Sequence, residues 1–244
     1  DCYPYLYGST RLTILFPQWS QDGGPEKFKE VLASDEGRAR LKMDMFTRGT
    51  SYQDMWLTYF KREHNHKFEG KSIAEAAIIS MKSEVDTMCD LLLDEDLQVS
   101  FVMAGVNGKT LPQFVTHPMS MVGSDALLIG EFPSPRTYGT FPTILAEYVR
   151  EERKMNLPEA IRKMTSFPAQ RLGILNRGTL KDNMLADLVV FDPERVSAPA
   201  TRTDPKQFAT GIDYVVVNGS IVIDHGIHTG VLAGKTIRRG RNHD

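Results

Sequence analysis

The sequence predicts an α/β protein followed by a small antiparallel β module, and two patterns lead to this prediction. From residue 1 to about 182, short apolar runs alternate with segments of helical periodicity, which is typical of βα units in a parallel sheet or barrel. From 183 to 244, β-branched runs follow one another with no helix between the last two, which indicates antiparallel strands. The boundary is expected within residues 177–183 (RGTLKDN).

Short apolar runs in the first part are the expected strands. They are 55–60 (MWLTYF), 100–105 (SFVMAG) and 120–124 (SMVGS). A closed (β/α)8 barrel needs eight strands and typically about 250 residues. Three or four strands within residues 1–182 therefore predict either an open sheet or the second half of a barrel.

Helices are expected where apolar residues recur with a helical period. They span 25–33, 36–47, 73–94 (in two pieces), 110–116, 140–154 and 157–172. Pro142 and Pro158 would then fall in first turns, where the missing N–H costs nothing.

The second part contains a strong hairpin signal. YVVVNGSIVID (214–224) places Asn218-Gly219 between two β-branched runs, and Asn-Gly favours the tight turns of two-residue hairpins. ADLVVFD (186–192) supplies a further strand. We expect the run 214–217 to be an exposed edge strand, which would make the chain prone to association.

Composition excludes several classes of function. Twenty-nine Lys and Arg against 31 Asp and Glu give a net charge of -2, so neither nucleic acid nor an anionic membrane is an expected partner. No apolar run approaches the ~20 residues needed to span a bilayer, and DCYPYLYGST has no signal-type character, which predicts a soluble, cytoplasmic protein. Cys2 and Cys89 are too few for a disulfide framework, and Cys89 lies on an apolar helical stripe, as a buried structural thiol would.

Residues 117–142 are the most informative stretch for chemistry. Asp125 follows the expected strand 120–124, at the edge where α/β proteins carry ligands, and a carboxylate there can bind a metal ion and accept a proton from metal-bound water. A turn or helix cap is the alternative. Arg136 follows in a proline-stiffened loop, where its planar fork suits a ligand carboxylate or, alternatively, loop carbonyls.

Four motifs, in order, resemble the C-terminal half of the N-acyl-D-amino-acid deacylases, the D-aminoacylase branch of the metal-dependent amidohydrolase superfamily. The motifs are DCYPYLYGST, GSD followed by PSPRTYGTFP, EAIRKMTSFPAQRLGI and RGTLKDNMLADLVVFDPERV. The resemblance runs from residue 1 to about 240. It implies a partial (β/α)8 TIM-type barrel over 1–182, with an inserted segment at about 18–95, and strands of a small β-sandwich domain over 183–244.

The same resemblance implies zinc-dependent hydrolysis of an N-acyl-D-amino acid to a carboxylate and a D-amino acid. Asp125 would contact the zinc ion and act as general base and then acid. Arg136 would hold the substrate α-carboxylate, assisted by Tyr3 and Ser9 of the YPY-x-x-GS motif. We expect Asp125 and Arg136 to open onto one cleft, with Asp125 the deeper of the two.

Part of the family's site has no match in this chain. The other metal ligands are expected upstream of Asp1, so the chain would carry only the C-terminal part of the site, with the missing N-terminal half of the barrel as its partner. Alone it would bind little zinc and be inactive. His64 and His66 are expected in a solvated loop because charged residues surround them, and Asn183 stands where the family has a left-handed Gly.

Two alternatives remain open. One is a different amidohydrolase branch acting on cyclic amides, such as a dihydroorotase or hydantoinase, although YPY-x-x-GS and P-x-PR-x-YG favour a linear N-acyl substrate. The other is a non-catalytic, truncated chain that serves as an interaction module.

Overall fold

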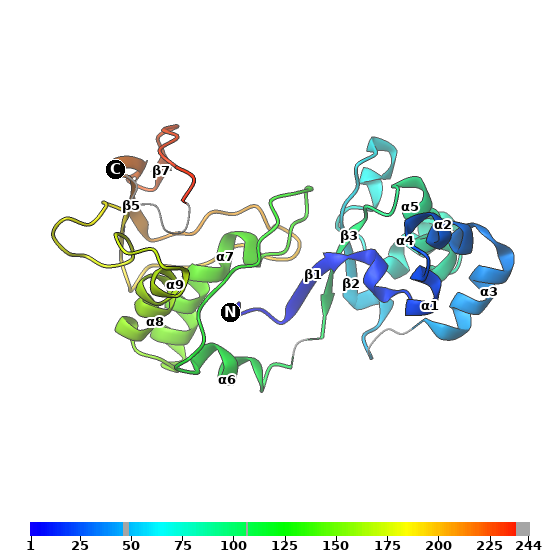
Figure 1. Cartoon of the computed structure of the whole chain (residues 1–244), viewed down its shortest axis with the longest axis horizontal. Helices are drawn as coiled ribbons and strands as arrows, with labels where there is room; N and C mark the ends of the chain where they lie inside the picture. The colour runs from blue at the N-terminus through cyan, green and yellow to red at the C-terminus, as the bar shows by residue number, and fades with distance from the viewer. Residues whose placement is uncertain (46–48, 106, 238–244) are drawn as a thin grey trace.

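Two antiparallel sheets organise the computed structural model, which describes residues 1–45, 49–105 and 107–237. The sheets lie in different halves of the mixed α/β molecule, the first beside α1–α5 and the second beyond α7–α9 (Figure 1). The first sheet has the order β1 (Tyr7–Arg11), β3 (Ser100–Ala104), β2 (Met55–Tyr59). The second has the order β4 (Leu188–Phe191), β5 (Ile212–Val217), β6 (Ser220–Asp224), β7 (Ile227–His228).

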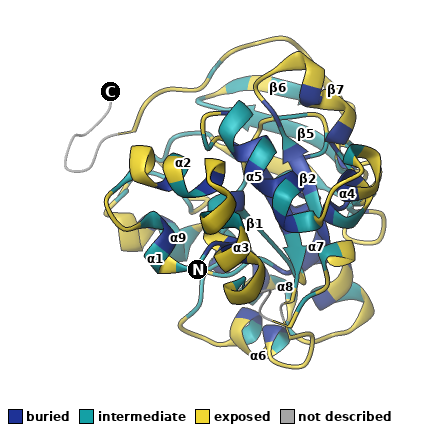
Figure 2. Cartoon of the chain, turned by 90° about the vertical axis from the view of Figure 1, so that its right-hand side faces the viewer, coloured by how far each residue is buried: buried dark blue, intermediate teal, exposed yellow. Residues whose placement is uncertain are grey.

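The first sheet is packed by a helical unit with its own core. Its helices are α1 (Gln18–Gln21), α2 (Pro25–Ala33), α3 (Asp35–Asp44), α4 (Ile73–Ser80) and α5 (Glu84–Asp94), with 3-10 turns η1 (Leu12–Leu15), η2 (Tyr52–Asp54) and η3 (Glu63–Phe68). Apolar residues at helical spacing, such as Phe28 and Leu32 of α2 and Met88 and Leu92 of α5, are buried in one cluster. Figure 2 shows mostly exposed residues on α2 and buried ones on β2 and α5.

Local signals placed these helices correctly. The predicted helix 25–33 is α2, and the predicted division of 73–94 occurs at Met81, whose φ of 53° ends α4. Ser72 caps α4 through a capping box with Glu75. The helix predicted over 36–47 is α3, although residues 46 and 47 lie outside the described part of the chain.

The free thiol of Cys89 is structural, as predicted. Its side chain is buried in the α5 core, and this burial raises the pKa of the Cys89 thiol to about 12. It therefore stays protonated and unreactive at neutral pH. Burial also raises the pKa of the half-buried Cys2 thiol.

The expectation of parallel pairing in the first part is wrong for the two strands that form. Runs 55–60 and 100–105 are strands, but β2 pairs antiparallel with β3, and β3 pairs antiparallel with β1. Strand β1, in which Thr10 lies opposite Phe101, was not predicted from the sequence. Strand propensity says little about a partner so far away in sequence, because packing decides the pairing.

The predicted strand 120–124 is not a strand. It retains one parallel bridge, between Cys2 and Val122, with Cys2 donating its N–H to Met121 O (3.0 Å) and accepting from Gly123 N (3.2 Å). Two further backbone groups of this run form hydrogen bonds with Lys163. The Lys163 carbonyl accepts from Val122 N (3.1 Å), and Lys163 Nζ donates to Ser120 O (2.9 Å). These hydrogen bonds take the place of pairing with a neighbouring strand.

A long helix follows the 125–135 loop, and it begins earlier than predicted. After α6 (Leu111–Thr116), α7 runs from Arg136 to Thr143 and continues as the π-helix η4 (Ile144–Glu151). Pro142 therefore lies inside α7 and not in a first turn; a helix-interior proline has no N–H to donate, and the wider winding of η4 follows it. Pro158 does lie in the first turn of α8 (Leu157–Met164), which precedes α9 (Ser166–Leu172).

The β module confirms the hairpin and corrects the edge. Val217 lies opposite Ser220 across a turn in which Asn218 and Gly219 have φ of 48° and 80°. The run 214–217 belongs to β5, which is hydrogen-bonded on both sides, so the expected edge is wrong; β4 and β7 are the edge strands. Asn183 has the expected left-handed φ, at 68°.

In the described ranges, no helix has the length and apolar character needed to cross a membrane.

Candidate functional site

Arg136 is the most deeply buried charged group near the predicted site. It is the first residue of α7 and its side chain is 1% exposed. Pro133 and Pro135 restrict the preceding backbone, and Ser134 O accepts from Thr137 N (2.9 Å), which fixes the start of the helix. A guanidinium buried to this degree needs partners for its five N–H groups.

Asp125 provides one of those partners. Arg136 Nη2 donates to Asp125 Oδ2 and to Asp125 O, both at 2.7 Å. Both oxygens belong to one residue whose φ is 47°, a left-handed conformation that Asp tolerates. The two side chains expected to share a cleft therefore contact each other, although Asp125 is not among the residues that line the small cavity bordered by Arg136.

The predicted depth of the two residues is wrong. The Asp125 side chain is 71% exposed, whereas Arg136 is 1% exposed, so Arg136 is the deeper group. The reason is structural: Asp125 lies on a left-handed bend outside any strand, while Arg136 lies beneath it at the start of a packed helix.

Tyr3 and Ser9 lie at the same group. The Arg136 guanidinium carbon stands 4.2 Å from the centroid of the Tyr3 ring, a cation–π distance. Ser9, in β1, lines a small cavity together with Arg136. The structure thus brings together all four residues selected from the sequence.

The cavity beside Arg136 is lined by both hydroxyl-bearing and apolar residues. Its volume is about 10 Å³, and its lining includes Ser9, Thr58, Ser100, Ser134 and Thr137 together with Leu127, Ile129 and Pro133. Ser134 Oγ, Arg136 Nε and Arg136 Nη1 are buried and have no hydrogen-bond partner among the described residues. The cavity therefore combines a cation with donors that have no partner.

Thr58, Ser100 and Ser134 at the cavity, and one nearby carboxylate, were not predicted from the sequence. Glu69, which is 7% exposed, accepts from Phe60 N and from Glu131 N, both at 3.0 Å, and so ties the helical unit to the 125–135 loop. The position of Ser134 within PSPR was a signal for that residue. For Glu69 no sequence signal existed, because its two donors are set by tertiary packing.

Metal-ligating side chains do not cluster among the residues that the structure describes. Within these ranges no group of three His, Cys, Asp or Glu side chains is arranged for a metal. His64 and His66 are exposed, as expected, with His64 Nε2 2.5 Å from Asp94 Oδ2. The intervening Asn65 is not solvated: it is buried and donates to Glu95 Oε1 (2.6 Å).

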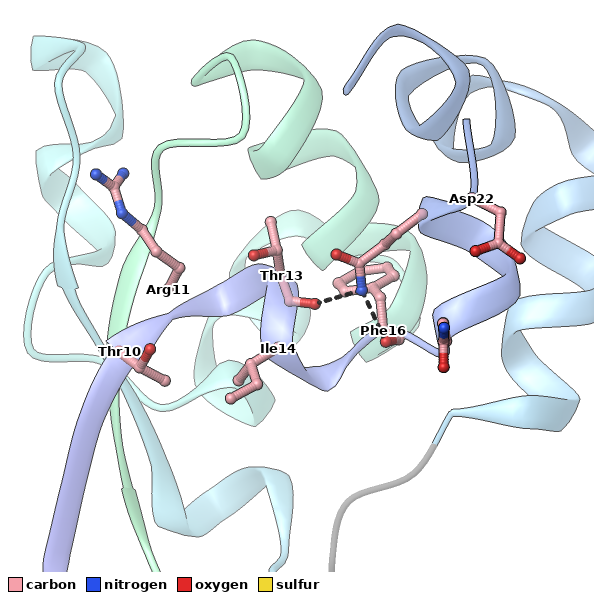
Figure 3. A pocket seen from close by; sticks show the side chains of 8 residues that line it. Thr10, Arg11, Thr13, Ile14, Phe16 and Asp22 are labelled. Atoms are coloured by element: carbon pink, nitrogen blue, oxygen red, sulfur yellow. Dashed lines mark hydrogen bonds between the residues drawn. The ribbon is translucent and has the colours of Figure 1, made fainter. Parts of the chain in front are cut away.

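A wider hollow lies elsewhere in the helical unit. Its volume is about 540 Å³, and it shares no lining residue with the Arg136 cavity. Figure 3 shows Arg11 and Asp22 on opposite sides of it, with Thr13 and Phe16 between. Gln21 Nε2 donates to Thr13 O (3.2 Å) and Phe16 O (3.0 Å), so this amide stabilises a turn.

Comparisons with known proteins point in the same direction as the geometry. The profile of the Amidohydrolase family matches residues 34–223. An N-acyl-D-aspartate deacylase of Alcaligenes xylosoxydans xylosoxydans is 32% identical over 80% of this chain and 43% of its own length. A D-aminoacylase crystal structure superposes with a TM-score of 0.74 at 29% identity, over 98% of this chain and 42% of the other.

A second solved structure is the N-acyl-D-glutamate deacylase of Bordetella bronchiseptica, in complex with zinc and a phosphonate mimic of the tetrahedral intermediate. It superposes with a TM-score of 0.70 at 28% identity, over 90% of this chain and 38% of the other. This chain therefore spans less than half the length of each of these three proteins.

Proposed function

This chain belongs to the amidohydrolase family, and on that premise we propose that it forms the C-terminal part of an enzyme that hydrolyses N-acyl-D-amino acids. The products would be a carboxylate and a free D-amino acid. One observation carries the proposal: a buried Arg136 with unpartnered donors lies in hydrogen-bond contact with an exposed Asp125. The relatives named as D-aminoacylase and as D-aspartate and D-glutamate deacylases support the substrate class.

Each predicted residue has a position suited to its proposed role. Arg136 binds the substrate α-carboxylate with the N–H groups that Asp125 leaves open, and Tyr3 and Ser9 border the same place. Asp125, whose carboxylate is exposed, is the general base and then the general acid at the amide bond. The likeness to D-aminoacylase over 98% of the chain supports a partial (β/α)8 barrel and a partial β-sandwich as the framework.

In our proposal the enzyme binds a divalent metal ion, zinc, and the described residues supply only some of its ligands. Asp125 would be one ligand, and the others would come from a part of the protein outside this sequence. The zinc complex of the related D-glutamate deacylase supports the choice of metal.

The experiment mixes this chain with the N-terminal half of a related deacylase and zinc, and we call this mixture the reconstituted enzyme. N-acetyl-D-amino acids should be cleaved much faster than N-acetyl-L-amino acids or N-acetyl-D-amino-acid amides, because the carboxylate site and the scissile amide fix two of the four Cα substituents. An inactive mixture, equal rates for the L forms or amides, or preferred cleavage of hydantoins would each contradict the proposal.

Arg136→Lys should mainly raise KM for carboxylate substrates. A lysine ammonium is a point charge that cannot replace a planar fork, and the loss of one charge-assisted hydrogen bond corresponds to about a tenfold change. Steady-state kinetics of the reconstituted enzyme measure this, with Arg195→Lys, which changes an exposed ion pair with Asp192, as the matched control. An unchanged KM with a reduced kcat would instead place Arg136 at the reacting amide.

A further inference from the structure

Ser134 is a buried hydroxyl without a partner. The residue is 4% exposed, and two prolines restrict the backbone on either side of it. Its carbonyl accepts from Thr137 N (2.9 Å), so the backbone of Ser134 is already held by α7. The hydroxyl does not help to fix this backbone, because Ser134 Oγ has no hydrogen bond within the described chain.

Most of the unpartnered buried atoms in the described part of the chain belong to Ser134 and Arg136. Five buried side-chain polar atoms lack a partner in the described ranges, and three of the five belong to Ser134 and Arg136. Leaving a buried donor unpaired costs about 1–3 kcal/mol, and more for a charged group. Ser134 and Arg136 both line the cavity, so a polar group bound there would supply the missing partners.

The size and lining of the cavity indicate what kind of group would bind there. Its volume of about 10 Å³ matches a single oxygen-sized atom, and no acidic side chain lines it. The Arg136 guanidinium and the Ser134 hydroxyl, the two lining groups with donors that have no partner among the described residues, can donate to one acceptor, so an anionic oxygen is the best match. Asp125 occupies only Arg136 Nη2, which leaves Nε and Nη1 for this acceptor.

We propose that Ser134 is a further substrate-binding residue, whose Oγ donates a second hydrogen bond to the carboxylate held by Arg136. This inference rests on the proposed function, which assigns the carboxylate to Arg136. It adds that the carboxylate is bound by groups two residues apart at the start of α7, a cation and a hydroxyl. Its selectivity is for a carboxylate over a neutral amide, because the amide lacks the negative charge that strengthens hydrogen bonds from a guanidinium, and its NH2 has no acceptor on Arg136.

The test measures binding of sodium acetate by the 244-residue chain, by NMR titration against sodium chloride at equal ionic strength. Ser134→Ala should weaken acetate binding about tenfold, the size of one hydrogen bond to a charged group. Ser134→Cys, a near-isosteric weak donor, should weaken it as well and serves if the alanine variant folds poorly. Arg136→Gln should abolish binding.

Thr87→Val is the matched control. Thr87 is 1% exposed and its Oγ1 is also buried without a described partner, but it lies on α5 in the helical core. If Ser134 were merely an unsatisfied hydroxyl, the alanine variant and Thr87→Val would both leave acetate affinity unchanged. That result, with Arg136→Gln still abolishing binding, overturns the role of Ser134 alone. No saturable acetate binding by the wild type, or binding that survives Arg136→Gln, would overturn the carboxylate site of the proposed function.

Discussion

Asp125→Asn is expected to abolish turnover of the reconstituted enzyme while leaving the fold nearly unchanged. General acid–base catalysis contributes about 10²–10⁴-fold, and an amide cannot accept the proton. The fold should tolerate the change, because Asn Oδ1 and the backbone carbonyl of residue 125 can both still accept from Arg136 Nη2, so the buried guanidinium keeps these partners. Initial rates with an N-acetyl-D-amino acid and urea unfolding measure the two effects.

Asp192→Asn is the control for this change. It makes the same replacement at another aspartate that pairs with an arginine, Arg195, at 2.6 Å in the β module. Its rate should match the wild type. Asp125→Asn with a rate close to that of Asp192→Asn would remove Asp125 from the reaction, and a large loss of stability would make it a structural residue instead.

Gly130→Ala should lower the free energy of unfolding by about 2–5 kcal/mol, the sum of a left-handed backbone cost and overpacking. Gly130 has a φ of 76°, and a Cβ there would stand 2.1 Å from Thr58 O in β2. The neighbour is backbone, so it has little freedom to move aside. The loop carrying Asp125 would therefore have to leave the sheet, which urea denaturation would record as a lower midpoint.

Gly219→Ala separates the two causes. Gly219 has a nearly equal φ of 80°, but an added Cβ would meet nothing within 4 Å. Only the backbone cost should appear, about 1–2 kcal/mol. Equal losses in the two variants would show that the contact between the 125–135 loop and β2 is looser than the structure indicates.

The elements that were predictable have signals contained within a few residues. The start of α2 at Pro25, the capping box at Ser72 and the Asn218-Gly219 hairpin each depend on nearby residues. By contrast, β1 pairs with β3 across a long stretch of intervening chain, and residues 120–124 lose their ladder to Lys163. These outcomes depend on tertiary contacts that hydrophobic periodicity does not describe.

The site followed the same division. Asp125 and Arg136 could be selected because both stand in motifs, and the structure pairs them at 2.7 Å. Their relative depth could not, since it depends on a left-handed bend at Asp125 and on where α7 begins. Ser134 Oγ lacks a partner within the described chain because of its tertiary surroundings, and a sequence motif does not show whether a buried donor has an acceptor.

The contact made by Glu69 affects whether residues 18–95 could be exchanged as an independent segment. Residues 18–95 look like an insertion in sequence, yet Glu69 within them binds Glu131 N, and Thr58 within them forms part of the Arg136 cavity. An engineer who exchanged this segment for one from another relative would also exchange a wall of the cavity and an anchor of the 125–135 loop. A successful graft must therefore carry Thr58, Glu69 and the loop together as one transferable unit.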